Sequence, residues 1–304
     1  MRKLSVITIN RNNAEGLRKT MRSVFAQTYR DFEYIVVDGA STDNSVDVIK
    51  AYAQAEGLDF KWISEPDTGI YNAMNKGIEI AEGRRVVNSF NRSELVEDKN
   101  GEANRQAGAA AENKETEDSY VLMLNSGDFL IAQDVLESVF SQESDADIIN
   151  ARCNVSSNGK VIWTSPYLPK VTLKDLYFVG LPHQSTFVRK SLIEQYGLYR
   201  EDFRYNSDID FWYKTIILGD ATIRGVNIVT TDYNLDGQST KDAQTETYKN
   251  EMKEILSQGF LPKVLPDYDC WKKDRYILNK YSWIEKHTCL QRVLALVRKI
   301  YKHI

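Results

Sequence analysis

The chain has 304 residues, a formal net charge of −4 and an apolar fraction of 42%. This length and composition suffice for a large folded core, which excludes a wholly disordered chain. The negative charge argues against nucleic acid as a general partner. Cys153, Cys270 and Cys289 lie far apart without metal-ligand spacing, so we expect neither a disulfide framework nor a zinc site.

The chain begins with a short apolar run, residues 4–9, which directly follows Met1-Arg2-Lys3. This run lacks the length and the cleavage site of a signal peptide, and no later run is long enough to span a bilayer. We therefore expect the protein to work in the cytoplasm.

Strand and helix patterns alternate in the first part of the chain. Apolar strands are predicted at 4–9, 34–37 and 60–63, and each precedes a segment with apolar residues at helical spacing. The clearest helix has a continuous apolar stripe made of Ile70, Ala73, Met74, Gly77, Ile78 and Ala81. Consecutive strand–helix units predict an α/β fold with a parallel sheet covered by helices.

A polar segment, residues 84–119, interrupts this pattern. Its composition cannot bury enough apolar surface to fold by itself, so we interpret it as a mobile insertion. Further elements are predicted in chain order: a strand at 120–124, a helix at 135–140, strands near 148 and 161–163, a helix near 192 and another at 206–217.

The end of the chain reads as helices, and the pattern at 289–304 is amphipathic and basic. An aliphatic face beside Arg292, Arg298, Lys299 and Lys302 suits an anionic membrane surface. The same pattern equally suits a helix that packs on its own domain or on a second copy.

Acidic side chains follow several predicted strands at their carboxyl ends, which converge on one rim in a parallel sheet. They are Asp38 and Asp43, Glu65 and Asp67, Asp128, and the pair Asp208 and Asp210. Ser41 is a candidate N-cap for the helix after the second strand. Each carboxylate alone also fits an ordinary turn or cap.

Segments in this order resemble the family 2 glycosyltransferases, inverting enzymes with the nucleotide-sugar-binding GT-A fold. Residues 36–45 resemble their nucleotide-binding turn, and 64–77 (SEPDTGIYNAMNKG) resemble a segment of bacterial polysaccharide enzymes. Residues 124–128 (LNSGD) stand where the metal-binding DxD motif is expected, and 206–212 resemble the motif with the base. The resemblance implies a GT-A domain with a mostly parallel sheet at 1–240 and leaves a helical extension at 241–304.

The resemblance also implies roles for individual residues. Asp208 would be the general base that takes the acceptor hydroxyl proton during attack on the anomeric carbon. Asp128 would face the donor diphosphate through Mg²⁺ or Mn²⁺. Nucleotide-sugar contacts are implied for Thr8, Asn10, Asp38, Ser41, Asp43, Asp67, Lys76 and His183.

Several of these residues have a second interpretation. Lys76 either reaches a phosphate or is solvated, and His183 either contacts substrate or only bonds within its loop. Asp210 is an alternative base, and Trp212 is either a sugar-stacking wall or core. Two departures from the family pattern affect nucleobase choice and metal dependence: Gly39 replaces a usual Asp, and Asn125 and Gly127 leave Asp128 as the single carboxylate of the DxD-like segment.

The leading hypothesis is an inverting glycosyltransferase of cell-surface polysaccharide synthesis. It would move a sugar from a nucleoside-diphosphate donor to a hydroxyl of a glycan or lipid-linked saccharide, in the cytoplasm or on the inner face of the cell membrane. An alternative is a catalytically silent nucleotide-sugar-binding or scaffolding protein. A nicotinamide-dependent oxidoreductase is disfavoured because residues 10–16 are asparagine-rich and lack Gly-x-Gly-x-x-Gly.

Overall fold

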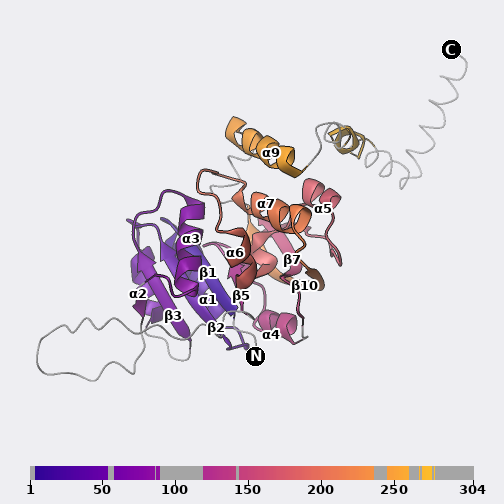
Figure 1. Ribbon diagram of the computed structural model, residues 1–304. Coiled ribbons are helices and arrows are strands. Elements are labelled where there is room, and N and C mark those ends of the chain that lie inside the picture. The colour runs from indigo at the N-terminus through magenta and orange to yellow at the C-terminus, as the bar shows by residue number, and fades with distance from the viewer. Residues whose placement is uncertain are drawn as a thin grey trace, which may run out of the picture. The chain divides into compact units, whose positions relative to one another are not determined.

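A mostly parallel sheet forms the centre of the molecule in this computed structural model (Figure 1). The structure describes residues 4–53, 58–85, 87–89, 119–141, 144–235, 245–259, 267, 269–275 and 277. The predicted helix at 289–304 and most of the predicted insertion lie outside these residues. Within them, the sheet order is β4-β3-β2-β1-β5-β9-β7-β10-β6, with β8 paired to β7.

The first half contains the parallel strands that the sequence predicts. They are β1 (Leu4–Asn10), β2 (Phe32–Asp38) and β3 (Asp59–Ser64), and the accompanying helices are α1 (Ala14–Phe25), α2 (Ser45–Ala53) and α3 (Ile70–Ala81). The short β4 (Asn88–Ser89) pairs antiparallel with β3, so this described part of the predicted insertion belongs to the sheet.

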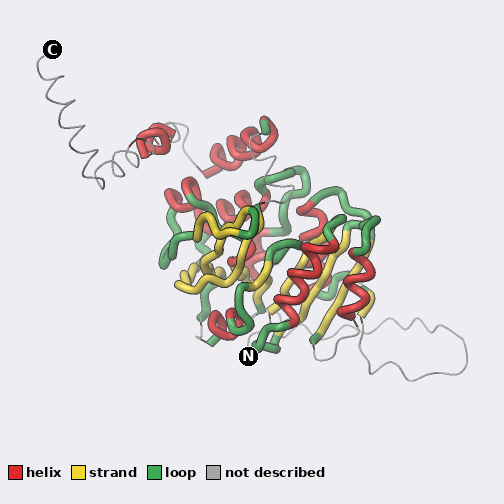
Figure 2. Tube along the Cα trace, turned by 180° about the vertical axis from the view of Figure 1, so that it is seen from behind, coloured by secondary structure: helices red, strands yellow, loops and turns green. Residues whose placement is uncertain are grey.

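Helices cover both faces of this half of the sheet (Figure 2). Val6 and Ile7 point to opposite faces because strand side chains alternate. Val6 belongs to a buried cluster with Leu17 of α1 and Ile49 of α2. On the other face, a methyl group at Gly77 of α3 would lie 2.4 Å from Ile7 Cγ2, so the missing side chain permits close packing.

The second half extends the sheet with mixed strand directions. β5 (Tyr120–Met123) is parallel to β1, and β9 is antiparallel to both β5 and β7. Its remaining elements are β6 (Phe129–Leu130), α4 (Val135–Phe140), β7 (Ile148–Ser157), β8 (Lys160–Thr164), α5 (Leu173–Phe178), η2 (His183–Ser185), β9 (Thr186–Arg189), α6 (Lys190–Tyr196), α7 (Ser207–Trp212), η3 (Tyr213–Leu218), β10 (Ile223–Asn234) and α9 (Glu246–Gly259).

The chain divides into two units, residues 1–252 and 253–304. The first unit contains the whole described sheet, and the described residues of the second are helical. None of the described helices has both the length and the apolar character needed to cross a membrane.

Candidate functional site

The carboxyl end of β2 is organised around the carboxylate of Asp38, which is fully buried. It accepts hydrogen bonds from Asn10 Nδ2 (2.8 Å), the Ser64 hydroxyl (2.7 Å), and the backbone N–H and hydroxyl of Ser41 (2.9 and 2.5 Å). Strand register places Asn10, Asp38 and Ser64 side by side at the rim. Ser41 therefore donates to the Asp38 carboxylate. The prediction that Ser41 is the N-cap of α2 is wrong, because α2 begins only at Ser45.

A second carboxylate, that of Asp67, lies over Gly39. A methyl group at position 39 would lie 2.1 Å from Asp67 Oδ2, so this carboxylate occupies the space next to Gly39. Arg11 Nη1 lies 3.5 Å from Asp67 Oδ1. The rim thus has an acidic group beside Asp38 although the sequence has glycine where the family usually has Asp.

Asp43 and Lys76 hold the loops around this rim. Asp43 accepts hydrogen bonds from the backbone N–H groups of Ala14 (2.9 Å) and Ser45 (3.0 Å), which are at the N-termini of α1 and α2. Lys76 Nζ donates to the Pro66 carbonyl (2.7 Å) and pairs with Glu65 (2.8 Å). Lys76 is therefore not a solvated side chain, and any contact with a phosphate remains a prediction.

A second cluster joins the DxD-like segment to the predicted base. His183 Nδ1 lies 3.2 Å from Asp208 Oδ2, and its Nε2 lies 3.2 Å from Asn125 Nδ2. Because the assigned amide N–H donates to Nε2, the other ring nitrogen carries the proton that points at Asp208. Tyr71 donates to Asp208 Oδ1 (3.0 Å) and to the Tyr205 carbonyl (2.6 Å). Burial and the Asp208 charge raise the pKa of Tyr71, which keeps its hydroxyl protonated.

The start of α7 is fixed from outside the helix. Glu251 accepts hydrogen bonds from the backbone N–H groups of Arg204, Tyr205 and Asn206 (2.6, 3.0 and 3.0 Å). Asp208 stands in the first turn that follows, and its side chain is 17% exposed. One carboxylate oxygen atom of Asp208 thus faces His183 and the other faces Tyr71, while the side chain still reaches solvent.

The alternative interpretations of α7 are resolved by burial. Asp210 is 2% exposed and pairs with Lys214 (2.5 Å), which directs it away from Asp208. Trp212 is 1% exposed and donates to the Leu181 carbonyl (3.2 Å). Trp212 is therefore core and not a sugar-stacking wall.

Asp128 is buried at the turn between β5 and β6 and contacts the end of β10. It is 4% exposed, and its Oδ1 accepts the backbone N–H of Asn234 at the end of β10 (3.1 Å). The chain turns at Gly127, where φ is +108°, a conformation that favours glycine. Burial raises the pKa of Asp128 to about 7. Its role as a cation ligand remains a prediction.

The described residues do not fit a metal site built by the protein. No group of three or more His, Cys, Asp or Glu side chains among them is arranged to hold a cation. Position 127 has no side chain, and Asn125 Oδ1 is buried without a hydrogen-bond partner in the described part of the chain.

Thr8 lies on β1, two residues before Asn10. Its side chain is fully buried, and its hydroxyl accepts a hydrogen bond from Tyr34 (3.0 Å). Thr8 is therefore buried next to the rim, on the same face of β1 as Asn10, and its contact with the donor remains a prediction.

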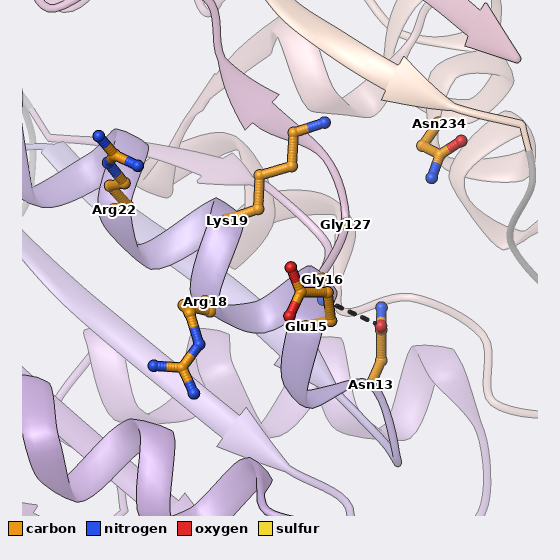
Figure 3. A pocket seen from close by; sticks show the side chains of 8 residues that line it. All are labelled: Asn13, Glu15, Gly16, Arg18, Lys19, Arg22, Gly127 and Asn234. Carbon is orange, nitrogen blue, oxygen red and sulfur yellow. Dashed lines mark hydrogen bonds between the residues drawn. The ribbon is translucent and has the colours of Figure 1, made fainter. Parts of the chain in front are cut away.

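A cavity of about 400 Å³ opens beside the DxD-like segment (Figure 3). Its lining combines Asn13, Gly127 and Asn234 with the exposed side of α1, which contributes Glu15, Gly16, Arg18, Lys19 and Arg22. Figure 3 shows the three cationic side chains projecting from α1. None of the rim residues described above lines this cavity.

Tyr71, Arg11 and Glu251 were missed in the sequence. Tyr71 stands within the SEPDTGIYNAMNKG segment, but a tyrosine in the first turn of an amphipathic helix is typical of core packing. Arg11 is one residue past β1, and only the structure brings it to Asp67. Glu251 is distant in sequence, and no local pattern indicates its contact with α7.

Comparisons with known proteins agree with this architecture. Residues 5–89 match the family model of glycosyl transferase family 2. An uncharacterized glycosyltransferase of Mycobacterium tuberculosis is 48% identical over 81 residues, which is 26% of this chain and 30% of that protein. A PGL/p-HBAD biosynthesis glycosyltransferase of the same species is 24% identical over 234 residues, 76% of each chain.

Solved structures show the same fold. Staphylococcus aureus TarS 1-349 in complex with UDP-GlcNAc has a TM-score of 0.55 and 18% identity, over 84% of this chain and 66% of that one. The mannosyltransferase PcManGT of Pyrobaculum calidifontis, solved with GDP-Man and Mn²⁺, has a TM-score of 0.53 and 12% identity, over 95% and 82%.

The sheet and its covering helices have the GT-A fold of these glycosyltransferase structures. By the match at residues 5–89 and the named relatives, the chain is similar to members of glycosyltransferase family 2. The match covers only 30% of the length of the first relative.

Proposed function

We propose that the chain transfers a sugar from a nucleoside-diphosphate donor to a hydroxyl of a glycan or lipid-linked saccharide, with inversion at the anomeric carbon. The observation that carries this proposal is the placement of Asp208, oriented by His183 and Tyr71 and still accessible. The relatives' ligands support a nucleotide-sugar donor, because TarS was solved with UDP-GlcNAc and PcManGT with GDP-Man.

Asp208 would act on the acceptor hydroxyl. Its carboxylate takes the hydroxyl proton while the oxygen forms a bond to the anomeric carbon, and the bond from that carbon to the donor phosphate breaks on the opposite side. The nucleoside diphosphate leaves with the electron pair. The N–H of His183 and the O–H of Tyr71 donate to Asp208, which fixes the orientation of its carboxylate.

The rim around Asp38 is the proposed place of the nucleotide. Asn10, Asp38, Ser41, Asp43 and Asp67 all contribute to this rim, either through the hydrogen-bond cluster or by holding its loops. Asn10 Oδ1 is buried without a partner among the described residues, which leaves one acceptor for a nucleobase or ribose donor.

The cation, the cellular setting and the pathway remain proposals. Mg²⁺ or Mn²⁺ is a family expectation, since PcManGT was solved with Mn²⁺, and the described residues offer it no site of their own. Work on the inner face of the cell membrane in cell-surface polysaccharide synthesis belongs to the proposal. The relative's name supports only a biosynthetic glycosyltransferase, and the residues of the proposed membrane helix lie outside the described ones.

Donor hydrolysis and binding, measured against UDP-, GDP- and dTDP-sugars with and without Mn²⁺, test the proposal. We expect one donor to be hydrolysed slowly and Asp208→Asn to reduce release by about 100-fold or more while binding is retained. Asp202→Asn is the matched control, because Asp202 is an exposed carboxylate near α7.

A catalytically silent nucleotide-sugar-binding or scaffolding protein is the second candidate, favoured by the inward-facing Asp128. It predicts donor binding, no turnover with any acceptor, and no difference between wild type and Asp208→Asn.

A further inference from the structure

The α1 pocket, defined by the lining residues of Figure 3, has an excess of positive charge. Its lining contains three cations, Arg18, Lys19 and Arg22, and one carboxylate, Glu15. Lys19 Nζ lies 3.8 Å from the centre of the Phe129 ring, a cation–π contact that directs the side chain along the pocket wall. Among the described residues, no ion pair within 4.0 Å neutralises any of these three cations.

The spacing along α1 places these cations on one side of the helix. Positions 15, 18, 19 and 22 lie on one side of a helix, and like charges three or four residues apart repel each other. A bound anion relieves this repulsion. The cost of leaving the cations unpaired is small in water, so the pocket stays open without a ligand.

The rest of the lining suits an anion with several oxygen atoms. Asn13 and Asn234 bring amide groups. The buried Gly127 donates its N–H to the Thr20 hydroxyl, and the Asn13 amide bonds Ser126 and the Gly16 N–H, so these groups hold the pocket wall while the cations face the ligand. Arginine forms paired hydrogen bonds to phosphate oxygens, and lysine adds a point charge.

Electrostatics separates the pocket from the nucleotide rim. The nucleotide rim contains the carboxylates Asp38 and Asp67, whereas the lining of the α1 pocket contains three cations, which attract a phosphate group. We propose that the α1 pocket binds the phosphate or diphosphate group of a second ligand, distinct from the sugar donor. This inference goes beyond the proposed function and does not depend on turnover.

Titration of the full chain with inorganic pyrophosphate, followed by calorimetry, tests the proposal. We expect saturable binding that weakens at least tenfold in R18Q/R22Q and falls with added salt. The matched control is K160Q/K170Q, which removes the same charge from exposed lysines outside the pocket. Equal loss in both double variants would mean general charge attraction and overturn the proposal.

A second arm separates the pocket from the donor site. The titration is repeated with saturating UDP and with saturating GDP, and we expect pyrophosphate binding to persist. Abolition of binding by either nucleotide, or pyrophosphate binding that R18Q/R22Q leaves unchanged, would overturn the proposal.

A third arm identifies the source of the phosphate. Sedimentation with phosphatidylglycerol vesicles, compared with phosphatidylcholine vesicles, tests a lipid headgroup. Anionic vesicle binding that R18Q/R22Q weakens and pyrophosphate displaces would support a headgroup as the ligand. Pyrophosphate binding without vesicle binding would support a phosphate or diphosphate in solution or on an acceptor.

Discussion

The carboxylate of Asp67 and a side chain at position 39 compete for one space. We expect Gly39→Asp to displace Asp67 from Arg11 and to cost about 1 kcal/mol of unfolding free energy, because a flexible side chain can move but two carboxylates repel. Urea unfolding of Gly39→Asp, Gly39→Ala and the double variant Gly39→Asp/Asp67→Gly measures this. The double variant should recover the loss, and Gly39→Ala separates steric conflict from charge.

Donor affinity provides the functional test at this position. If Asp67 supplies the acidic group of the nucleotide rim, Gly39→Asp/Asp67→Gly should bind donor nearly as well as wild type, whereas Asp67→Gly alone should bind it about tenfold more weakly. Equal donor affinity of wild type and Asp67→Gly would show that Asp67 has no part in nucleotide binding.

His183 is a positioning residue in the proposed mechanism, because it contacts Asp208 and not the reacting atoms. We expect His183→Ala to lower kcat by about 10- to 100-fold with little change in the donor KM, since one of the hydrogen bonds that orient the base is lost. His183→Gln, which retains an N–H donor, should recover part of kcat. A rise in donor KM at constant kcat would instead indicate ground-state donor binding by His183.

At the scale of elements, the loop before α7 depends on a single side chain of α9. Glu251 is 6% exposed and accepts three backbone N–H groups. We expect Glu251→Ala to lower the unfolding free energy by about 3 kcal/mol, since each unsatisfied buried donor costs about 1–3 kcal/mol and water replaces part of the loss. Activity should fall as well, because Asp208 follows this loop.

Chemical denaturation together with initial rates measures both effects of Glu251→Ala. Glu246→Ala is the matched control, because Glu246 lies in the same helix with its side chain 79% exposed. Comparable stability losses in the two variants would show that helix propensity, and not the contact with the α7 loop, accounts for the effect.

Local periodicity predicted most elements of the first half correctly. The stripe of Leu17, Met21 and Val24 is fully buried in α1, and the predicted helix at 70–81 has the bounds of α3. The orientation of Asp128 and Thr8 was not predictable in this way. It depends on a positive φ at Gly127 and on packing against Tyr34, which only the assembled sheet determines.

The candidate site also contains residues that local sequence predicts and residues that only tertiary packing brings together. The sequence placed Asp208 and His183 in polar segments near strand ends, and the structure brings their side chains into contact. The partners Tyr71 and Glu251 come from elements far away in the chain. Contacts of this kind arise from tertiary packing, for which one sequence contains no periodic signal.

At the scale of the whole molecule, two buried carboxyl groups, Glu33 and Asp128, make the stability of the fold depend on pH in opposite directions. Glu33 of β2 accepts a hydrogen bond from Ser5 (2.5 Å) and pairs with Lys61 (2.6 Å) and Lys190 (3.4 Å). Burial raises the pKa of Glu33, but the two lysines and the hydrogen bonds outweigh it, so the net pKa is lowered. Its contribution to stability is present above the unfolded pKa and is lost as pH falls through the folded pKa.

The contribution of Asp128 to stability depends on pH in the opposite direction. Its pKa is raised from 3.8 to about 7, so between these values the folded state binds more protons than the unfolded state. Stability from the neutral carboxyl is present below pH 3.8 and is lost as pH rises through about 7. Glu33 and Asp128 together favour a stability optimum at weakly acidic pH.

Asp128→Asn tests this linkage because asparagine stays neutral at every pH and nearly preserves the shape of the side chain. Between pH 5 and pH 8 the wild type should lose about 3 kcal/mol that the variant keeps, at about 1.4 kcal/mol per pKa unit. Urea unfolding of both proteins at the two pH values measures the difference, and Asp202→Asn, an exposed substitution, should leave the pH dependence unchanged. Parallel pH curves for wild type and Asp128→Asn would mean that Asp128 is ionised in the folded protein at both pH values, and its role as a cation ligand would then regain support.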